Sequence, residues 1–229
     1  MSLRLLALSV ALVGASAAMA QDVTSEKGKI SYAVGYDLGR SLVERGIDID
    51  SATLQRAIQD GMARKAPALP LQQMAQVLGA MQQRLLAQAK ADFDRAAVGN
   101  RAASDRFIAQ NRAKPGVKTL ADGIQYRVIE DGNGPAVRPD RQVRILYRAS
   151  ISTGQEFATS YSGANPQPTT VVINESPLAG IKQILPMMRQ GAHWEILLPP
   201  EQAYGSGPGS PIGPNQAVLF DIKVVEVGK

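Results

Sequence analysis

Apolar residues recur every three or four positions through the first half of the chain, the spacing of one helix face. The first stripe lies between Ser25 and Gly46 and consists of Ile30, Val34, Leu38 and Leu42. The second follows Asp50, a residue type that caps helix N-termini well, and consists of Leu54, Ile58 and Met62. The two patterns predict two helices, the first of which ends at Gly46.

A third helical segment is much longer. No proline occurs between Pro70 and Asn111, and the apolar residues of its first half keep the same spacing. A helix of this length spans roughly 60 Å at about 1.5 Å per residue. Its second half is polar and rich in alanine, with isolated Phe93 and Phe107. The pattern predicts an exposed connecting rod, with dimerisation by the helices that precede it.

The period changes to two after the breaker "KPG" at 114–116. Apolar residues alternate with polar ones in "GIQYRVIEDGNG" and in "RQVRILYRASISTGQEF", within which Thr153-Gly154 predicts a turn. Further strands are expected in "TTVVI", "AHWEILLP" and "AVLFDIKVVEV", with one short helix between Leu178 and Met188. The predicted fold class is an all-α N-terminal part and long connecting helix, followed by an α+β domain with an antiparallel sheet and a single helix.

The first twenty residues have the pattern of a signal peptide. Arg4 precedes an apolar core at 5–13, and Ala18-Met19-Ala20 is a small-x-small cleavage pattern. The core is about half the length that a membrane-spanning helix needs, and no later segment is long enough. We therefore expect a protein cleaved after Ala20, in the periplasm or exported to the cell surface, without a transmembrane segment. The predicted parts are a signal peptide at 1–20, a helical dimerisation domain at 21–69, the connecting helix at 70–115 and the α+β domain at 116–229.

Charge is uneven along the chain. Residues 21–115 contain 14 Lys and Arg against 10 Asp and Glu, whereas residues 116–229 contain 10 of each. The basic residues of the long helix are interspersed with Asp92, Asp94 and Asp105. That mixture is typical of a solvated helix face, so we expect no nucleic-acid partner.

The available side chains exclude several kinds of chemistry. His193 is the single histidine and there is no cysteine, so neither a tetrahedral zinc site nor a cysteine–histidine dyad can form, and no disulfide is possible. In "GAHWEILLPP", His193 is expected to be an exposed strand residue. No carboxylate pair or phosphate-binding loop stands out, and we expect no metal and no cofactor. What remains is an apolar set with Tyr204 in a glycine- and proline-rich loop, which suits binding of an apolar ligand.

Five segments carry a resemblance to a known family. They are "ISYAVGYDLGRSLVERGIDID", "GIQYRVIEDGNGP", "ILYRASISTGQEFATS", "MMRQGAHWEILLPPEQAYG" and "PIGPNQAVLFDIKVVEV". In order and spacing they resemble the FKBP-type peptidyl-prolyl cis-trans isomerases (rotamases), and the mature chain is similar to their secreted bacterial branch, the macrophage infectivity potentiator (Mip) type. The resemblance implies a sheet wrapped round a short helix, and a homodimer formed by the N-terminal helices.

The resemblance also implies the site. Catalytic roles fall to Tyr147 and Phe157 as pocket walls and to Tyr204 as hydroxyl donor to the substrate carbonyl. Substrate-binding roles fall to Leu178, Ile181, Ile212 and Phe220. Without the resemblance, the favoured interpretation of Tyr147, Phe157 and Phe220 is that they are ordinary core residues.

Three positions depart from the family pattern. Ala158 stands where the family usually has an aspartate, Ile181 where it usually has a tryptophan, and Pro186 interrupts the single helix. A proline inside a helix costs about 3 kcal/mol. Loss of one polar contact in the transition state is worth roughly 2 to 4 kcal/mol, so low activity is expected.

Three functions follow. The first is a peptidyl-prolyl isomerase and folding factor for proline-containing or unfolded exported polypeptides, with macrolide inhibitors as candidate ligands. The alternative is a non-catalytic or weakly catalytic periplasmic chaperone that uses the same groove and a helical cleft. The third is a purely structural dimer whose β-rich half caps the rod.

Overall fold

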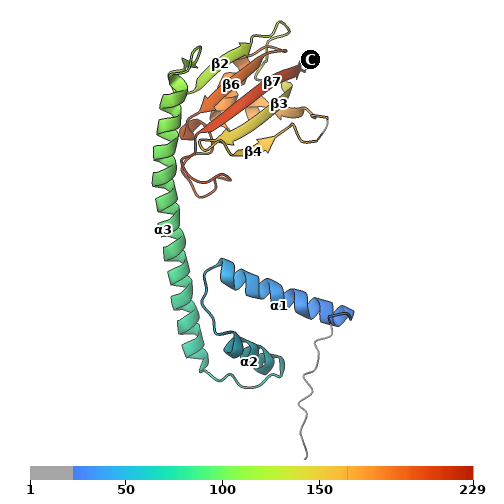
Figure 1. Ribbon diagram of the computed structural model, residues 1–229, viewed down its shortest axis with the longest axis vertical. Helices are drawn as coiled ribbons and strands as arrows, with labels where there is room; N and C mark the ends of the chain where they lie inside the picture. The colour runs from blue at the N-terminus through green and yellow to red at the C-terminus, as the bar shows by residue number, and fades with distance from the viewer. Residues whose placement is uncertain (1–22, 164, 229) are drawn as a thin grey trace, which may run out of the picture. The chain divides into compact units, whose positions relative to one another are not determined.

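The computed structural model describes residues 23–163 and 165–228, and the predicted signal peptide lies outside them (Figure 1). The chain divides into two compact units between Met81 and Gln82. The first unit is helical, and the second contains the β-sheet. Within the described residues, no helix combines the length and apolarity needed to cross a membrane.

The predicted helices are present as α1 (Glu26–Glu44), α2 (Ser51–Met62) and α3 (Leu71–Arg112). The carboxylate of Asp50 accepts a hydrogen bond from the backbone N–H of Thr53 at 2.7 Å, which caps α2 as the sequence predicts. Hydrogen bonding with the side chain of Thr53, and next with its backbone N–H, lowers the pKa of Asp50. Local signals therefore account for where this helix begins.

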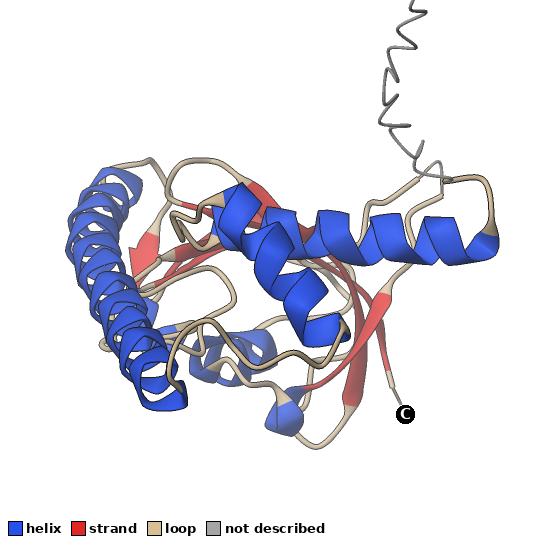
Figure 2. Cartoon of the chain, turned by 90° about the horizontal axis from the view of Figure 1, so that it is seen from below, coloured by secondary structure: helices blue, strands red, loops and turns tan. Residues whose placement is uncertain are grey.

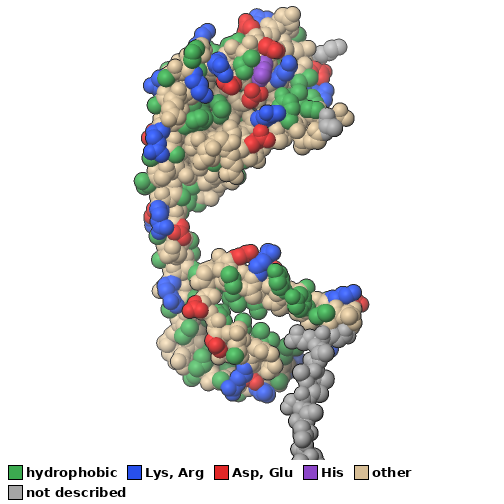
Figure 3. Space-filling model, viewed as in Figure 1, with side chains coloured by type: hydrophobic (Ala, Val, Ile, Leu, Met, Phe, Trp, Pro, Cys, Tyr) green, Lys and Arg blue, Asp and Glu red, His purple; other side chains and the backbone are tan. Residues whose placement is uncertain are grey.

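The helices α1 and α2 bury none of their residues within the chain. On the predicted stripe of α1, Ile30 is 58 % exposed, Val34 65 % and Leu38 40 %. Figure 3 shows hydrophobic side chains gathered on the visible surface of α1. Burial of apolar surface is the main driving force for folding. Because α1 and α2 bury none of their residues within the chain, they form helices but no hydrophobic core of their own.

The second unit is built on one antiparallel sheet, which is curved (Figure 2). Its strands are β1 (Lys118–Thr119), β2 (Gln125–Glu130), β3 (Gln142–Ile151), β4 (Glu156–Thr159), β5 (Thr169–Val172), β6 (His193–Leu198) and β7 (Val218–Val227). The order is β1-β2-β6-β7-β3-β4, and β5 also pairs with β3. The predicted antiparallel sheet is confirmed, whereas β1 and β4 were not expected from the alternation of the sequence.

The core lies between the sheet and a short helix, α4 (Ala179–Ile184). Ile184 and Ile196 are fully buried there. Pro186 was expected to interrupt a longer helix, and the structure shows how its cost is avoided. The α-helix ends at Ile184, and Pro186 lies in a following 3₁₀ turn, η2 (Leu185–Met187), near its first position. A proline is tolerated at the start of a helical turn because its missing N–H would have no partner there.

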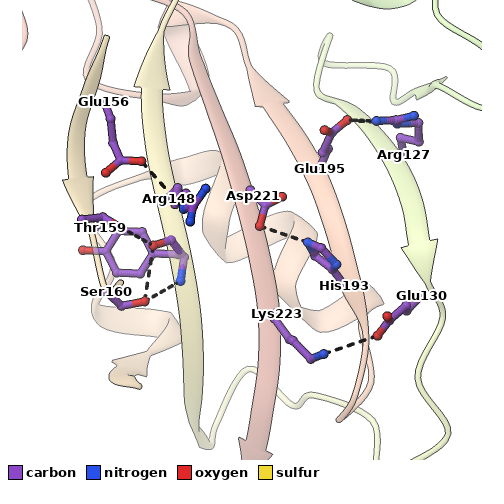
Figure 4. A network of polar contacts seen from close by, with 11 residues as sticks. Arg127, Glu130, Arg148, Glu156, Thr159, Ser160, His193, Glu195, Asp221 and Lys223 are labelled. Atoms are coloured by element: carbon purple, nitrogen blue, oxygen red, sulfur yellow. Dashed lines mark hydrogen bonds and ion pairs between the residues drawn. The ribbon is translucent and has the colours of Figure 1, made fainter. Parts of the chain in front are cut away.

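The opposite face of the sheet carries cross-strand ion pairs (Figure 4). Arg127 on β2 pairs with Glu195 on β6 at 2.5 Å. His193 on β6 lies 3.0 Å from Asp221 on β7 and is partly exposed, in agreement with its expected place on a strand. Exposed pairs of this kind contribute little to stability, typically below about 1 kcal/mol each.

The end of α3 departs from the prediction of an exposed rod. Ser104 is fully buried and Asn111 is 5 % exposed, and both bond to the β-sheet unit. The amide of Asn111 donates to the side-chain oxygen of Gln125 at 2.9 Å, and Gln125 donates to the carbonyl of Ile108 at 3.0 Å. The last turns of α3 are therefore packed on the sheet unit through polar side chains.

Candidate active site

A cavity of about 200 Å³ lies on the core side of the sheet. It is lined by residues of β3, β4, β5 and β7, the segment before α4, α4 itself and Tyr204. The lining residues are Ile145, Tyr147, Ala149, Phe157, Ala158, Thr169, Val171, Ser176, Pro177, Leu178, Ile181, Tyr204, Phe220 and Ile222. None of these side chains carries a charge at neutral pH.

The strand register explains the wall on the β3–β7 side. Tyr147 on β3 pairs with Ile222 on β7, and Ala149 pairs with Phe220. Because side chains alternate between the faces of a strand, every second residue of β3 points to the same side. Tyr147 and Ala149, with Phe220 and Ile222 opposite them, thus form one continuous apolar wall of the cavity.

Ala158 lies on β4 opposite Ala149 of β3. Phe157, its neighbour in sequence, lines the cavity and meets the ring of Tyr204 edge-on, with 6.2 Å between ring centroids. Ala158 also lines the cavity, so a methyl group stands at this point of the wall. The departure noted in the sequence therefore falls inside the cavity.

The far side of the cavity is formed around α4. Leu178 and Ile181 are each 6 % exposed. Between them, Gly180 is closely packed: a Cβ at this residue would lie 2.5 Å from Cδ2 of Leu198 and 3.0 Å from the carbonyl of Gln202. A glycine is therefore required here for α4 to lie close to the segment that leads to Tyr204.

Tyr204 follows a 3₁₀ turn, η3 (Pro200–Gln202), and precedes Gly205, whose φ of 74° is in the left-handed region. The N–H of Gly205 donates to the carbonyl of Pro200 at 2.8 Å, which closes the turn. Burial, with a smaller effect from Tyr147, raises the pKa of the Tyr204 hydroxyl. The hydroxyl is therefore protonated at neutral pH and available as a donor.

Six of the seven expected site residues lie at this cavity, and Ile212 does not. Ile212 is half-buried, and the lining residues do not include it. Sequence reasoning did not name Thr169, Val171, Ser176 or Pro177. The alternation of Thr169 and Val171 along β5 places both on one face, but only the pairing of β5 with β3 brings that face to the cavity.

A larger cavity of about 440 Å³ lies in the first unit. Its walls come from α2, the connection to α3 and the start of α3. They include Arg56, Asp60 and Lys65, and a hydrogen bond from Lys65 to Asp60 lowers the pKa of this carboxyl. A charged cavity of this kind is less suited to a proline ring than the apolar one.

Two stretches of the chain match family descriptions. Residues 27–128 match the "domain amino terminal to FKBP-type peptidyl-prolyl isomerase", and residues 134–225 match "FKBP-type peptidyl-prolyl cis-trans isomerase". The relatives below match over nearly the whole chain. The chain belongs to the FKBP-type peptidyl-prolyl cis-trans isomerases.

Individual relatives show which members of the family this chain is most similar to among those compared below. The chain is 34% identical to the outer membrane protein MIP of Legionella longbeachae, over 98% of this chain and 94% of that protein. It is 33% identical to the peptidyl-prolyl cis-trans isomerase Mip of Coxiella burnetii, over 95% and 94% of the two chains. The crystal structure of FkpA from Escherichia coli superposes with a TM-score of 0.67 at 30% identity, covering 90% of this chain and 98% of that one. The protein is thus an isomerase of the Mip and FkpA type.

Proposed function

We propose that the cavity at Tyr204 binds a prolyl residue of an exported polypeptide and catalyses rotation about the preceding peptide bond. The observation that carries this proposal is a tyrosine in the wall of a cavity that is otherwise lined by uncharged side chains. Rotation about a peptide bond meets a barrier of about 20 kcal/mol, because the twisted amide loses its resonance. Such a reaction requires no nucleophile, only tighter binding of the twisted form than of the planar forms.

Each side chain has a proposed role. Tyr147 and Phe157 form the walls against the proline ring, and Tyr204 donates a hydrogen bond to the substrate carbonyl. Leu178 forms the lip, and Ile181 and Phe220 complete the apolar surface. Ile212, outside the lining, is proposed to contact only residues that flank the proline.

The test of this function is Tyr204→Phe in the mature chain. The rate of cis-trans exchange in a short X-Pro peptide, measured by NMR, is expected to fall about tenfold, because one preorganised donor is lost. Tyr161→Phe, which keeps the ring that lies against Arg148 outside the cavity lining, is the matched control and should leave the rate unchanged. Equal rates for Tyr204→Phe and the unmodified protein would exclude Tyr204 as the donor.

The departures at Ala158 and Ile181 are proposed to hold the activity below that of family members with the usual residues. The double substitution Ala158→Asp and Ile181→Trp is expected to raise kcat/KM about tenfold, by supplying a polar contact and a larger floor. Thr153→Asp adds the same charge at the exposed turn and should change nothing. A double variant no faster than the parent would show that these positions do not limit catalysis.

We also propose that the chain is a homodimer formed by its N-terminal helices, with the domain limits inferred from the sequence. Two apolar rows lie on α1: one contains Ile30, Val34 and Leu38, and a second contains Tyr32 and Tyr36, whose rings are 6.1 Å apart. All five side chains are at least 40 % exposed in the single chain. A second copy supplies the surface that would bury them. Sedimentation of the mature protein as a monomer would contradict this proposal.

The alternative, a chaperone with weak or no catalysis, is favoured by the combination of Ala158 in the cavity and the exposed apolar rows of α1. It predicts that a Tyr204→Phe variant still suppresses aggregation of an unfolded client as well as the parent does. If neither the variant nor the parent protein suppresses this aggregation, the chaperone function is excluded.

Export to the periplasm or cell surface is supported by the signal pattern at 1–20 and by a relative named as an outer membrane protein. Mass spectrometry of the protein from cell fractions should give a chain that begins at Gln21. A macrolide is a further candidate occupant of the cavity. Its binding is expected to compete with an X-Pro peptide, which a titration followed by NMR can measure.

A further inference from the structure

The loop that contains Tyr204 is tied to α3 on its C-terminal side. The carbonyl of Gly205, the next residue, accepts a hydrogen bond from the N–H of Asn215 at 2.9 Å. The side-chain amide of Asn215 donates to the carbonyl of Ala97 on α3 at 3.1 Å. One residue thus joins the backbone beside Tyr204 to the helix.

Asn215 is suited to this position in two ways. Its φ is 56°, in the left-handed region that asparagine and glycine adopt more readily than other residues. Its side chain also supplies the donor for Ala97. A glycine at this position would keep the backbone conformation and lose only the bond to α3.

Further polar contacts fix the same segment on α3. The Ser104 hydroxyl donates to the carbonyl of Asn215 at 2.9 Å and accepts from the N–H of Ala217 at 2.8 Å. The Asn100 amide donates to the carbonyl of Pro214 at 2.9 Å. Ser104 is fully buried, so loss of its hydroxyl would leave backbone groups without partners.

The segment before Tyr204 is also linked to α3. Glu201, in the turn η3, forms an ion pair with Arg101. This pairing lowers the pKa of Glu201 and raises that of Arg101. The two side chains are 60 % and 46 % exposed, and solvent therefore weakens their interaction. The contacts of the fully buried Ser104 and the half-buried Asn215 are the stronger part of the connection.

We propose that the stretch of α3 from Ala97 to Ser104 positions Tyr204, with Asn215 and Ser104 as positioning residues and Arg101 as a weaker support. The loop from Gly205 to Gly213 contains four glycines, whose backbone is less restricted than that of other residues. A hydrogen-bond donor contributes to catalysis only if it is held in place, and a displacement of about 1 Å can cost about a hundredfold in rate. The proposal rests on the function proposed for Tyr204.

The test is a double-substitution cycle in the mature full-length protein. Asn215→Gly alone is expected to lower kcat/KM for an X-Pro peptide about three- to tenfold, with KM nearly unchanged. In a Tyr204→Phe background, Asn215→Gly should cause no further loss, because the hydroxyl it positions is absent. A substitution that damages the fold in general would lower the rate equally in both backgrounds, and this result would overturn the proposal.

A second readout is independent of catalysis. Hydrogen–deuterium exchange in residues 203–213 should be faster in Asn215→Gly than in the parent, with exchange in β6 unchanged. Unchanged exchange in 203–213 would overturn the proposal whatever the activity. The two proposals can fail separately. If exchange is faster in Asn215→Gly but Tyr204→Phe keeps full activity, α3 still supports this loop and Tyr204 is excluded as the donor.

Arg101 and Arg95 provide a matched pair on α3. Arg101→Met should lower kcat/KM less than Asn215→Gly does, about twofold, because its ion pair is exposed. Arg95 pairs only with Asp92 on the same helix, at 3.3 Å, among the described residues. Arg95→Met should therefore leave the rate unchanged, and an equal loss in both arginine variants would show that α3 acts through its general stability.

Discussion

The helices at the start of the chain and the sheet at its end are stabilised in different ways. α1 and α2 begin at well-formed caps and follow a clear apolar period, yet they bury no side chain of their own. The sheet unit has shorter elements with weaker local signals, and its core includes fully buried residues from β6, β7 and α4. The contrast teaches that a strong local pattern specifies a helix, whereas a stable unit requires a partner surface to bury that pattern.

The largest expected effect is on α1. Leu38→Asp places one charge from each copy in the proposed dimer interface and should weaken association roughly ten-thousandfold, because each buried charge without a partner is costly. Sedimentation and circular dichroism should show a monomer with less helix, and the sheet unit should remain folded. Lys29→Asp, off the apolar row, is the control. A dimer that tolerates Leu38→Asp would show that this row is not the interface.

The second effect is in the core of the sheet unit. Ile196 is fully buried on β6, and Ile196→Ala should lower the free energy of unfolding by about 4 kcal/mol through lost burial and a cavity. Val128→Ala on β2, at 37 % exposure, should cost far less. Chemical denaturation measures both. If the two variants lose equal stability, the core does not lie where the structure places it.

A smaller effect is expected where α4 meets the segment before Tyr204. Gly180→Ala should destabilise by about 1 to 3 kcal/mol, since the new methyl group would overlap Leu198. A methyl group added at Gly99 on α3 would meet no neighbouring atom within 4 Å, so Gly99→Ala should be neutral or stabilising by up to about 1 kcal/mol. Thermal melts separate these outcomes, and a neutral Gly180→Ala would contradict the close packing.

The smallest effect concerns pH. The cavity at Tyr204 has no carboxylate or amine in its walls, and burial raises the pKa of Tyr204 above its ordinary 10.0. The donor form is thus present below this pKa and is lost only as pH rises through it. We expect kcat/KM to be constant between about pH 6 and pH 9. A step in this range would reveal a titrating group that the cavity lining does not contain.

Sequence reasoning reached the helices and most strands because their signals are local. Asp50 marks the start of α2, and the alternation around Tyr147 marks β3. The strand β4, Glu156–Thr159, was missed because it lacks the run of β-branched residues that marks β5, a strand of the same length.

The candidate site was only partly accessible from the sequence. Six of its residues were predicted from the family resemblance. Thr169 and Val171 were not, because they line the cavity only through the pairing of β5 with β3. The contacts of α3 were not foreseen. Ser104 and Asn215 are separated by 111 residues, and a serine within a polar helix gives no sign that it is buried.

The burial of Ser104 has a consequence for fragment design. A recombinant sheet domain that begins at Gly116, where the helical pattern ends, would lack Asn100, Ser104 and Asn111, and would expose the backbone of residues 214–217 together with Gln125. A fragment that begins at Gln82 retains all these contacts. A fragment that keeps these contacts therefore begins inside a continuous helix, well before residue 116, where the sequence predicts that the α+β domain begins.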